Sequence, residues 1–270
     1  DSYTVGDGYY LGLSQEESRK RSLAAVRRAL ELDDSIAEAH TTLADRLHYA
    51  EWDWEGADRE FQRAIELSPG YATAHQWYAE LLGALGRTEE SIAAARQAEK
   101  LDPLSPAMPL SLSGALLIAR QWEEAEESLE RALEMEPEFV PALIQLAELL
   151  VVRERFPEAV ETWQKIYQIW GLDQLAQDLA DRFAEDGPPA IFRILLETPA
   201  PYEPDDIYKA YCYGHLGDFD LAFEHLGLAM DQRLNGTSYM GVWPSLDPLA
   251  EDPRFEELVT RLNRPPIPVD

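Results

Sequence analysis

The chain has 270 residues, of which 46% are apolar, and its 51 acidic against 23 basic side chains give a formal net charge of −28. Such an acidic surface repels phosphate groups, which argues against direct binding of nucleic acid or anionic membranes. No apolar run reaches the length of a membrane helix, so direct membrane insertion is not expected. A single cysteine excludes an internal disulfide framework. The compartment stays open, with the cytoplasm slightly favoured over the periplasm.

Residues 1–34 are interpreted as a truncated first repeat with a long loop. Asp1-Ser2-Tyr3 resembles the tail of a helix, and a stretch rich in Gly and Tyr follows it. Ser14 has Glu17 three residues later, which is a capping box. We therefore expect a helix that runs from this box to about Leu32.

Residues 35–171 are predicted to form a regular array of helical hairpins. The pattern recurs every 34 residues, so that Ala79 falls on Ser113 and Pro103 falls on Pro137. A fixed period of this length indicates stacked hairpins, because one hairpin cannot bury its own apolar face. The link Glu51–Gly56 in the first full unit holds one residue more than the period allows.

Small residues recur where two helices of a hairpin must approach closely, and larger ones fill the holes behind. Proline is expected to end the second helix of each hairpin, because it lacks an N–H donor and clashes with the preceding turn. The small positions are Ala44, Ala79, Ser113 and Ala147 on first helices and Ala57, Ser91, Ala125 and Ala159 on second helices; the fillers are Phe61, Ala95, Leu129 and Trp163; the terminating prolines are Pro69, Pro103 and Pro137.

The repeat register weakens after Gly171. We expect a helix over about Leu172–Ala184, a break at Gly187–Pro189 and then a further short helix. The remaining segments are 172–203, a degenerate helical repeat with a Pro-rich connector; 204–231, a last hairpin; and 232–270, an irregular stretch followed by a capping helix from Asp252 to about Asn263 and a loose tail.

These residues resemble the tetratricopeptide repeat (TPR) family over about Ala37–Gly171 and again over Pro204–Met230. The resemblance implies an all-α, right-handed TPR-type α-solenoid of antiparallel helix pairs, with a degenerate region before the last repeat and a C-terminal capping helix. The phrases WDWEGADREFQRAIELSP and DPLAEDPRFEELVTRL are similar to the C-terminal TPR region of bacterial multidomain signalling proteins. Those proteins are winged-helix regulators, kinases or nucleotide cyclases with TolB-like segments. The resemblance therefore implies that this sequence begins inside a longer protein.

The resemblance also places the first helix of each hairpin on a concave face that grips a partner. TPR domains that hold a chaperone tail use basic side chains there; this chain has acids, which excludes that ligand class. We expect a protein or peptide partner with an apolar stripe and basic flanks. The alternative is that the apolar positions pack on neighbouring helices or are covered by the C-terminal part of the chain. The expected groove residues are Thr41, Asp45, His48, Tyr49, Gln76, Glu80, Leu110, Leu117, Ile118, Ile144, Glu148, Val151 and Val152.

No group of residues indicates a metal, a cofactor or a nucleophile. His40 and His75 occupy matching repeat positions, which favours core packing, and His48 has no second ligand at metal spacing. Cys212 and His215 share a helix face, but a buried apolar cysteine is the favoured interpretation. Most tryptophans fit the repeat core; Trp52 and Trp243 do not, which makes them the better candidates for exposed contacts.

We therefore expect a non-catalytic protein–protein interaction scaffold. The sequence contains no GxGxxG, no Walker motif and no nucleophile elbow. A remote alternative is an enzyme with a site in 172–248. Another alternative is a self-association module that regulates an attached domain as a homodimer, with an interface anchored by Tyr9, Tyr10, Trp52, Trp54 and Trp243.

Overall fold

The computed structural model describes residues 15–266, so the expectations for Asp1–Tyr3, for the Tyr-rich loop, for Ser14 and for the tail from 267 lie outside it. The described chain is all-α: helices and turns follow one another without a β-strand. It divides into two compact units. Unit 1 comprises residues 15–103 and 264–266, and unit 2 comprises residues 104–263. The predicted array 35–171 thus contributes to both units, and each unit is described by itself.

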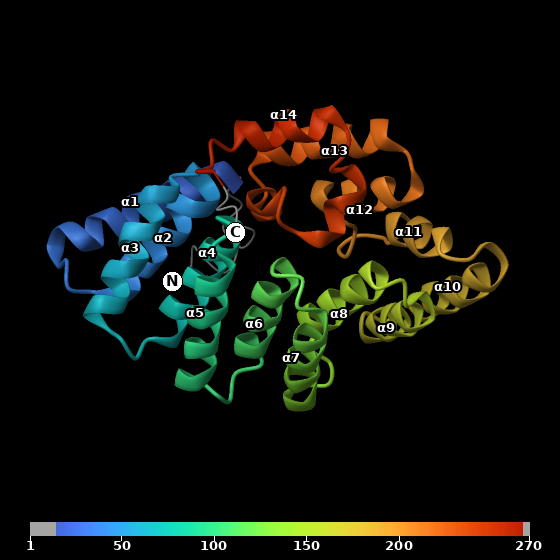
Figure 1. Ribbon diagram of the computed structural model, residues 1–270, viewed down its shortest axis with the longest axis horizontal. Coiled ribbons are helices and arrows are strands. Elements are labelled where there is room, and N and C mark those ends of the chain that lie inside the picture. The colour runs from blue at the N-terminus through green and yellow to red at the C-terminus, as the bar shows by residue number, and fades with distance from the viewer. Residues whose placement is uncertain (1–14, 267–270) are drawn as a thin grey trace. The chain divides into compact units, whose positions relative to one another are not determined.

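Unit 1 consists of a leading helix and two hairpins, in which consecutive helices pack on one another (Figure 1). The leading helix ends at Leu32, as the sequence predicted. The helices are α1 (Gln15–Leu32), α2 (Ala37–Arg46) with a π-helical turn η2 (Leu47–Glu51), α3 (Trp54–Leu67), α4 (Ala72–Ala84) and α5 (Thr88–Leu101).

Unit 2 continues the hairpin pattern and closes with irregular turns and a last helix (Figure 1). Gly187 interrupts the degenerate region with a φ of 71°, in agreement with the predicted break. The elements are α6 (Ala107–Ile118), α7 (Trp122–Met135), α8 (Val140–Val152), α9 (Phe156–Ile169), α10 (Asp173–Asp186), α11 (Pro189–Leu196), α12 (Asp206–Leu216), α13 (Phe219–Gln232), the 3₁₀ turns η3 (Asn235–Tyr239) and η4 (Pro244–Leu249), and α14 (Pro253–Arg261).

The 34-residue period of the sequence is reproduced in the helix boundaries. The second helices α3, α5, α7 and α9 begin at Trp54, Thr88, Trp122 and Phe156. Three of these helices end two residues before a proline, at Leu67, Leu101 and Met135. The proline ring cannot continue a helix, which explains why these ends recur in register.

The turn inside each regular hairpin uses one left-handed residue at a fixed place. The φ angles are 54° at Trp52, 71° at Gly86, 59° at Arg120 and 57° at Glu154. This conformation reverses the chain in few residues but favours glycine, since a Cβ crowds the following carbonyl. Three of the four turns therefore carry a small backbone strain, which the packing of the flanking helices overcomes.

The additional residue predicted in the first full hairpin is accommodated by η2. A π-helical turn contains one more residue than an α-helical turn over the same rise, so it absorbs a single-residue insertion without shifting the flanking helix. Trp52 follows η2 in the left-handed conformation, and Asp53 then caps α3 by accepting a hydrogen bond from the Gly56 N–H at 2.9 Å.

The predicted core positions are confirmed. All twelve small and filling residues named from the sequence are at most 3% exposed. Ser91 adds a polar link, because its hydroxyl donates to the Ala79 carbonyl oxygen at 2.7 Å and so joins α5 to α4 inside the core. The capping helix α14 packs on α13 in unit 2 and is held there by ion pairs of Arg254 with Asp220 and of Arg261 with Asp231. Within residues 15–266, no helix has both the length and the apolar character needed to cross a bilayer.

Candidate functional site

A stretch of non-repeat chain, residues 235–249, lies on the first helices of unit 2. We call it the covering segment. It contacts α8 and α12 through η4. At the end of α6, the Arg120 guanidinium donates to both carboxylate oxygens of Asp247, at 2.7 and 2.9 Å. The helices expected to form an open groove in unit 2 therefore already hold a polypeptide.

Glu148 on α8 is the polar centre of this contact. Its Oε2 accepts hydrogen bonds from the Trp243 indole Nε1–H at 3.0 Å and from the Ser245 hydroxyl at 3.2 Å. Burial raises the pKa of Glu148 to about 7, although these donors favour the charged form. A glutamate in the middle of an apolar helix is thus satisfied by the covering segment rather than by solvent.

The covering segment is anchored by apolar side chains as well. Met240, Val242, Leu246 and Leu249 are buried. Gly214 on α12 makes room for one of them: a Cβ at this position would lie 3.1 Å from Leu249 Cδ2 and 3.2 Å from its Cγ. A side chain at this position would therefore press on Leu249, so glycine allows the close approach of η4 to α12.

Three of the seven expected groove residues of unit 2 are buried. Leu117, Ile118 and Val151 are buried, at 3%, 9% and 3% exposure, so they offer no open apolar wall in this structure. Glu148 contacts the covering segment, while Leu110, Ile144 and Val152 keep part of their surface accessible. The covering segment contributes to this face, because η4 contacts α8 and Asp247 pairs with Arg120 at the end of α6.

In unit 1 the structure brings four of the six expected groove residues together. The Tyr49 hydroxyl donates to Glu80 Oε2 at 3.1 Å, and the Tyr49 ring stacks on His48 with centroids 4.0 Å apart. Asp45 forms an ion pair with Arg46. Burial raises the pKa of Glu80 to about 7, with the nearby Asp45 charge adding to the effect, and burial lowers the pKa of His48 to about 3.

The other two expected residues of unit 1 take no part in this cluster. The Thr41 hydroxyl donates to the Ala37 carbonyl oxygen at 2.9 Å within α2, and its side chain is buried. Gln76 on α4 is partly exposed. The carboxylates Asp45 and Glu80 therefore form the chemically distinctive part of this unit: burial raises the pKa of both, and at Asp45 it does so despite the ion pair with Arg46.

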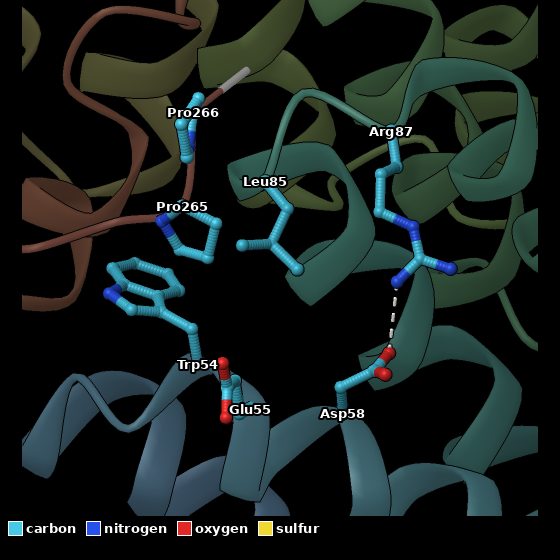
Figure 2. A pocket seen from close by; sticks show the side chains of 7 residues that line it. All are labelled: Trp54, Glu55, Asp58, Leu85, Arg87, Pro265 and Pro266. Carbon is cyan, nitrogen blue, oxygen red and sulfur yellow. Dashed lines mark hydrogen bonds and ion pairs between the residues drawn. The ribbon is translucent and has the colours of Figure 1, made fainter. Parts of the chain in front are cut away.

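Unit 1 also holds a short proline-containing segment. Arg264 donates to the Ala84 carbonyl oxygen at 2.7 Å, at the C-terminal end of α4. Pro265 and Pro266 then line a pocket of about 180 Å³ together with Trp54 and Leu85. Figure 2 shows the Pro265 ring beside the Trp54 indole, with the Arg87–Asp58 ion pair at the far side of the pocket. This is a second place where a repeat surface binds non-helical chain.

The remaining candidates from the sequence have structural partners. His40 is buried between Glu60, at 2.6 Å, and the Asp34 carbonyl oxygen, at 2.9 Å. Cys212 is buried, and burial raises the pKa of its thiol well above its ordinary value, which leaves it a poor nucleophile. Among the described residues, no group of three or more His, Cys, Asp or Glu side chains is arranged to hold a metal ion.

Two of the aromatic residues considered as dimer anchors, Trp54 and Trp243, are engaged within the chain. Trp54 is 4% exposed, and Trp243 donates to Glu148. Tyr9 and Tyr10 lie outside the described residues. The sequence analysis held covering by the C-terminal part of the chain as an alternative but did not assign it to residues 235–249. A usable signal was present, since a stretch without repeat character that carries Met240, Val242, Leu246 and Leu249 must bury them on some other element.

Comparisons with known proteins agree with this architecture. Residues 46–106 and 116–166 match tetratricopeptide repeat families, so the chain carries tetratricopeptide repeats in both stretches. Among curated protein sequences, none matches this chain.

Solved structures of the same fold include PilW, PilF and the Cut9–Hcn1 structure. PilW, described as a widely conserved type IV pilus biogenesis factor, is 17% identical with a TM-score of 0.54, over 91% of this chain and 92% of PilW. PilF from Pseudomonas aeruginosa is 21% identical with a TM-score of 0.52, over 88% of this chain and 94% of PilF. The Cut9–Hcn1 structure is 15% identical with a TM-score of 0.57, and 46% of that chain is covered. At these identities the likeness establishes the fold.

Proposed function

We propose that this chain, which carries tetratricopeptide repeats, is a non-catalytic interaction scaffold that binds polypeptide segments on the first helices of its hairpins. One observation supports this most directly: in unit 2 the covering segment lies on α8 and α12 and is tied to the end of α6. Stacked helical hairpins present extended surfaces of this kind, which repeat proteins use for binding. A surface that holds one irregular segment has the chemistry to hold another.

The contacts of the covering segment support a particular binding chemistry for this surface. Glu148 accepts hydrogen bonds from side chains of the segment, Arg120 forms a two-point ion pair with it, and Gly214 admits an apolar side chain. Each of these contacts uses a side chain or an open space on a helix rather than pairing of two backbones. Such a surface selects a partner by its side chains, with no need for a fixed secondary structure in the bound segment.

The charge of the chain restricts the class of polypeptide partner. The net charge of −28 favours a partner with basic residues. The buried apolar residues of the covering segment favour an apolar stripe beside them. We therefore propose a polypeptide ligand with an apolar stripe and basic flanks.

We further propose that the chain is a module of a larger bacterial signalling or regulatory protein. The phrases WDWEGADREFQRAIELSP and DPLAEDPRFEELVTRL support this assignment by resemblance. In such a protein, binding at the repeats would report on the presence of a partner to an attached output domain.

The test asks whether the unit 2 surface binds a polypeptide in trans. A fluorescein-labelled synthetic peptide with the sequence of residues 235–249 is titrated into the full chain and into its Trp243→Ala variant, and binding is followed by anisotropy. Because Trp243→Ala loosens the internal segment, we expect the variant to bind the peptide about tenfold more tightly than the parent chain does. A scrambled peptide is the control for non-specific binding.

A milder variant protects the experiment against misfolding. Asp247→Ala removes the partner of Arg120 at an exposed position and leaves the apolar anchors in place. Circular dichroism and thermal unfolding confirm that each variant is folded. Equal binding of the native and scrambled peptides by parent and both variants would overturn the proposal.

A further inference from the structure

Unit 2 contains an aromatic cleft that the repeat pattern does not explain. It has a volume of about 290 Å³ and lies where α8, α9 and the connector before α12 meet. Ile144, one of the expected groove residues, is part of its wall. The connector that forms another wall, residues 199–205, stands outside the repeat skeleton.

Two pairs of aromatic rings shape the cleft. Trp170 and Tyr202 are stacked face to face, with centroids 4.5 Å apart and planes within 5°. Trp163 meets Tyr208 edge to face at 6.1 Å. Tyr202 is 39% exposed, although it is a large aromatic residue. Stacking on Trp170 thus holds an accessible ring in a fixed orientation at the mouth of the cleft.

The charged residues that line the cleft are all acidic. Glu203 and Asp205 are among its lining residues, and no lysine or arginine is. Asp205 accepts a hydrogen bond from the Tyr208 N–H at 2.8 Å as the N-cap of α12. Glu203 is exposed and forms no ion pair with the described residues, whereas many other carboxylates of the chain pair with arginine. An accessible aromatic face beside two carboxylates attracts a cation with an apolar stem.

We propose that this cleft binds an arginine side chain of a polypeptide partner. A guanidinium is planar, so it stacks on an aromatic ring while its edge donates hydrogen bonds to carboxylates. The volume suits one long side chain rather than a whole helix. The inference rests on the proposed function, since it names the residue by which the scaffold recognises a basic polypeptide.

The test compares two peptides that differ only in charge. A fluorescein-labelled peptide of sequence GSALRLASG is titrated into the full chain, as is the same peptide with citrulline in place of arginine. Citrulline keeps the shape of the side chain and removes the positive charge. We expect the arginine peptide to bind about tenfold more tightly, and we expect this preference to weaken with added salt.

Variants of the cleft residues test whether the preference for the arginine peptide arises in the cleft. Tyr202→Ala and Glu203→Gln should each reduce it several-fold, and Asp205→Asn should do so while keeping the helix cap, since asparagine also caps well. Phe219→Ala is the matched control, because Phe219 is 38% exposed in the same unit and lies outside the cleft. It should leave the preference unchanged.

The outcomes separate this inference from the proposed function. Equal affinity for the arginine and citrulline peptides, or the same effect from Tyr202→Ala and Phe219→Ala, overturns the arginine site. The scaffold proposal would stand in that case if the peptide of residues 235–249 still binds in trans. Absence of binding by every peptide overturns both.

Discussion

The indole Nε1–H of Trp243 donates a hydrogen bond to the carboxylate of Glu148 at 3.0 Å, across 95 positions of the sequence. One residue belongs to a regular repeat helix and the other to a segment with no repeat character. Their contact fixes the covering segment on the first helices of unit 2. It also supplies hydrogen-bond donors to the Glu148 carboxylate, which offset part of the free-energy cost of burying it.

Replacing Trp243 with phenylalanine tests this bond directly. The ring is largely kept, but the donor to Glu148 is lost, so we expect unit 2 to lose about 1–3 kcal/mol of unfolding free energy. Hydrogen exchange should rise over residues 235–249. Trp122→Phe is the control, since the Trp122 indole donates to none of the described residues. Equal losses in the two variants would show that ring size, and not the hydrogen bond, determines the effect.

The Glu148 carboxyl should make stability depend on pH. Its pKa is about 7 in the folded chain and about 4.5 in the unfolded chain, so folding favours the protonated form. The stabilising contribution is complete below about pH 4.5 and is lost as the pH rises to about 7. Glu148→Gln cannot ionise at this position. Relative to that variant, the unfolding free energy of the parent chain should fall by on the order of 1–3 kcal/mol across this pH window. Urea unfolding at pH 5 and pH 7.5 measures the difference, and a constant difference would contradict it.

Two glycines of unit 2 should respond in opposite ways to alanine. Gly227 has nothing within 4 Å of the added Cβ, so Gly227→Ala should stabilise α13 by about 0.5–1 kcal/mol. At Gly214 the same gain is opposed by contact with Leu249, and we expect a net loss of about 1 kcal/mol. Shortening the neighbour in Gly214→Ala/Leu249→Ala should make the two substitutions non-additive. Denaturant unfolding of the parent chain, Gly214→Ala, Leu249→Ala and the double variant gives the coupling energy between the two positions.

The left-handed turn positions predict a stabilising substitution. Glu154 has a φ of 57° at the place that Gly86 occupies two repeats earlier, so Glu154→Gly should stabilise the chain by up to about 1 kcal/mol. Gly86→Ala should destabilise it by a similar amount for the converse reason. Thermal unfolding measures both, and a loss of stability in Glu154→Gly would mean that the side chain has a role that outweighs the strain.

The sequence alone determined the repeat architecture. A 34-residue period, small residues at fixed positions and terminal prolines each constrain local geometry, and together they gave the helices, the hairpins and the twelve core residues that the structure buries. The sequence also showed one extra residue, which it assigned to the link Glu51–Gly56, and the structure accommodates it just before that link, in η2 at Leu47–Glu51. These features are local or repeat at a fixed interval, so they can be recognised in the sequence alone.

The tertiary structure alone decided what covers the first helices. The contacts of Glu148 with Trp243 and of Gly214 with Leu249 join segments far apart in sequence, and no periodicity links them. The same holds for the aromatic cleft, where Trp170 meets Tyr202 across α10 and α11. Burial of apolar surface is non-directional, so a sequence shows that Leu246 and Leu249 must be enclosed but not which face encloses them. Only the folded chain selects that face, because the choice depends on shape, on the space beside glycine and on polar partners that come together only in the tertiary structure.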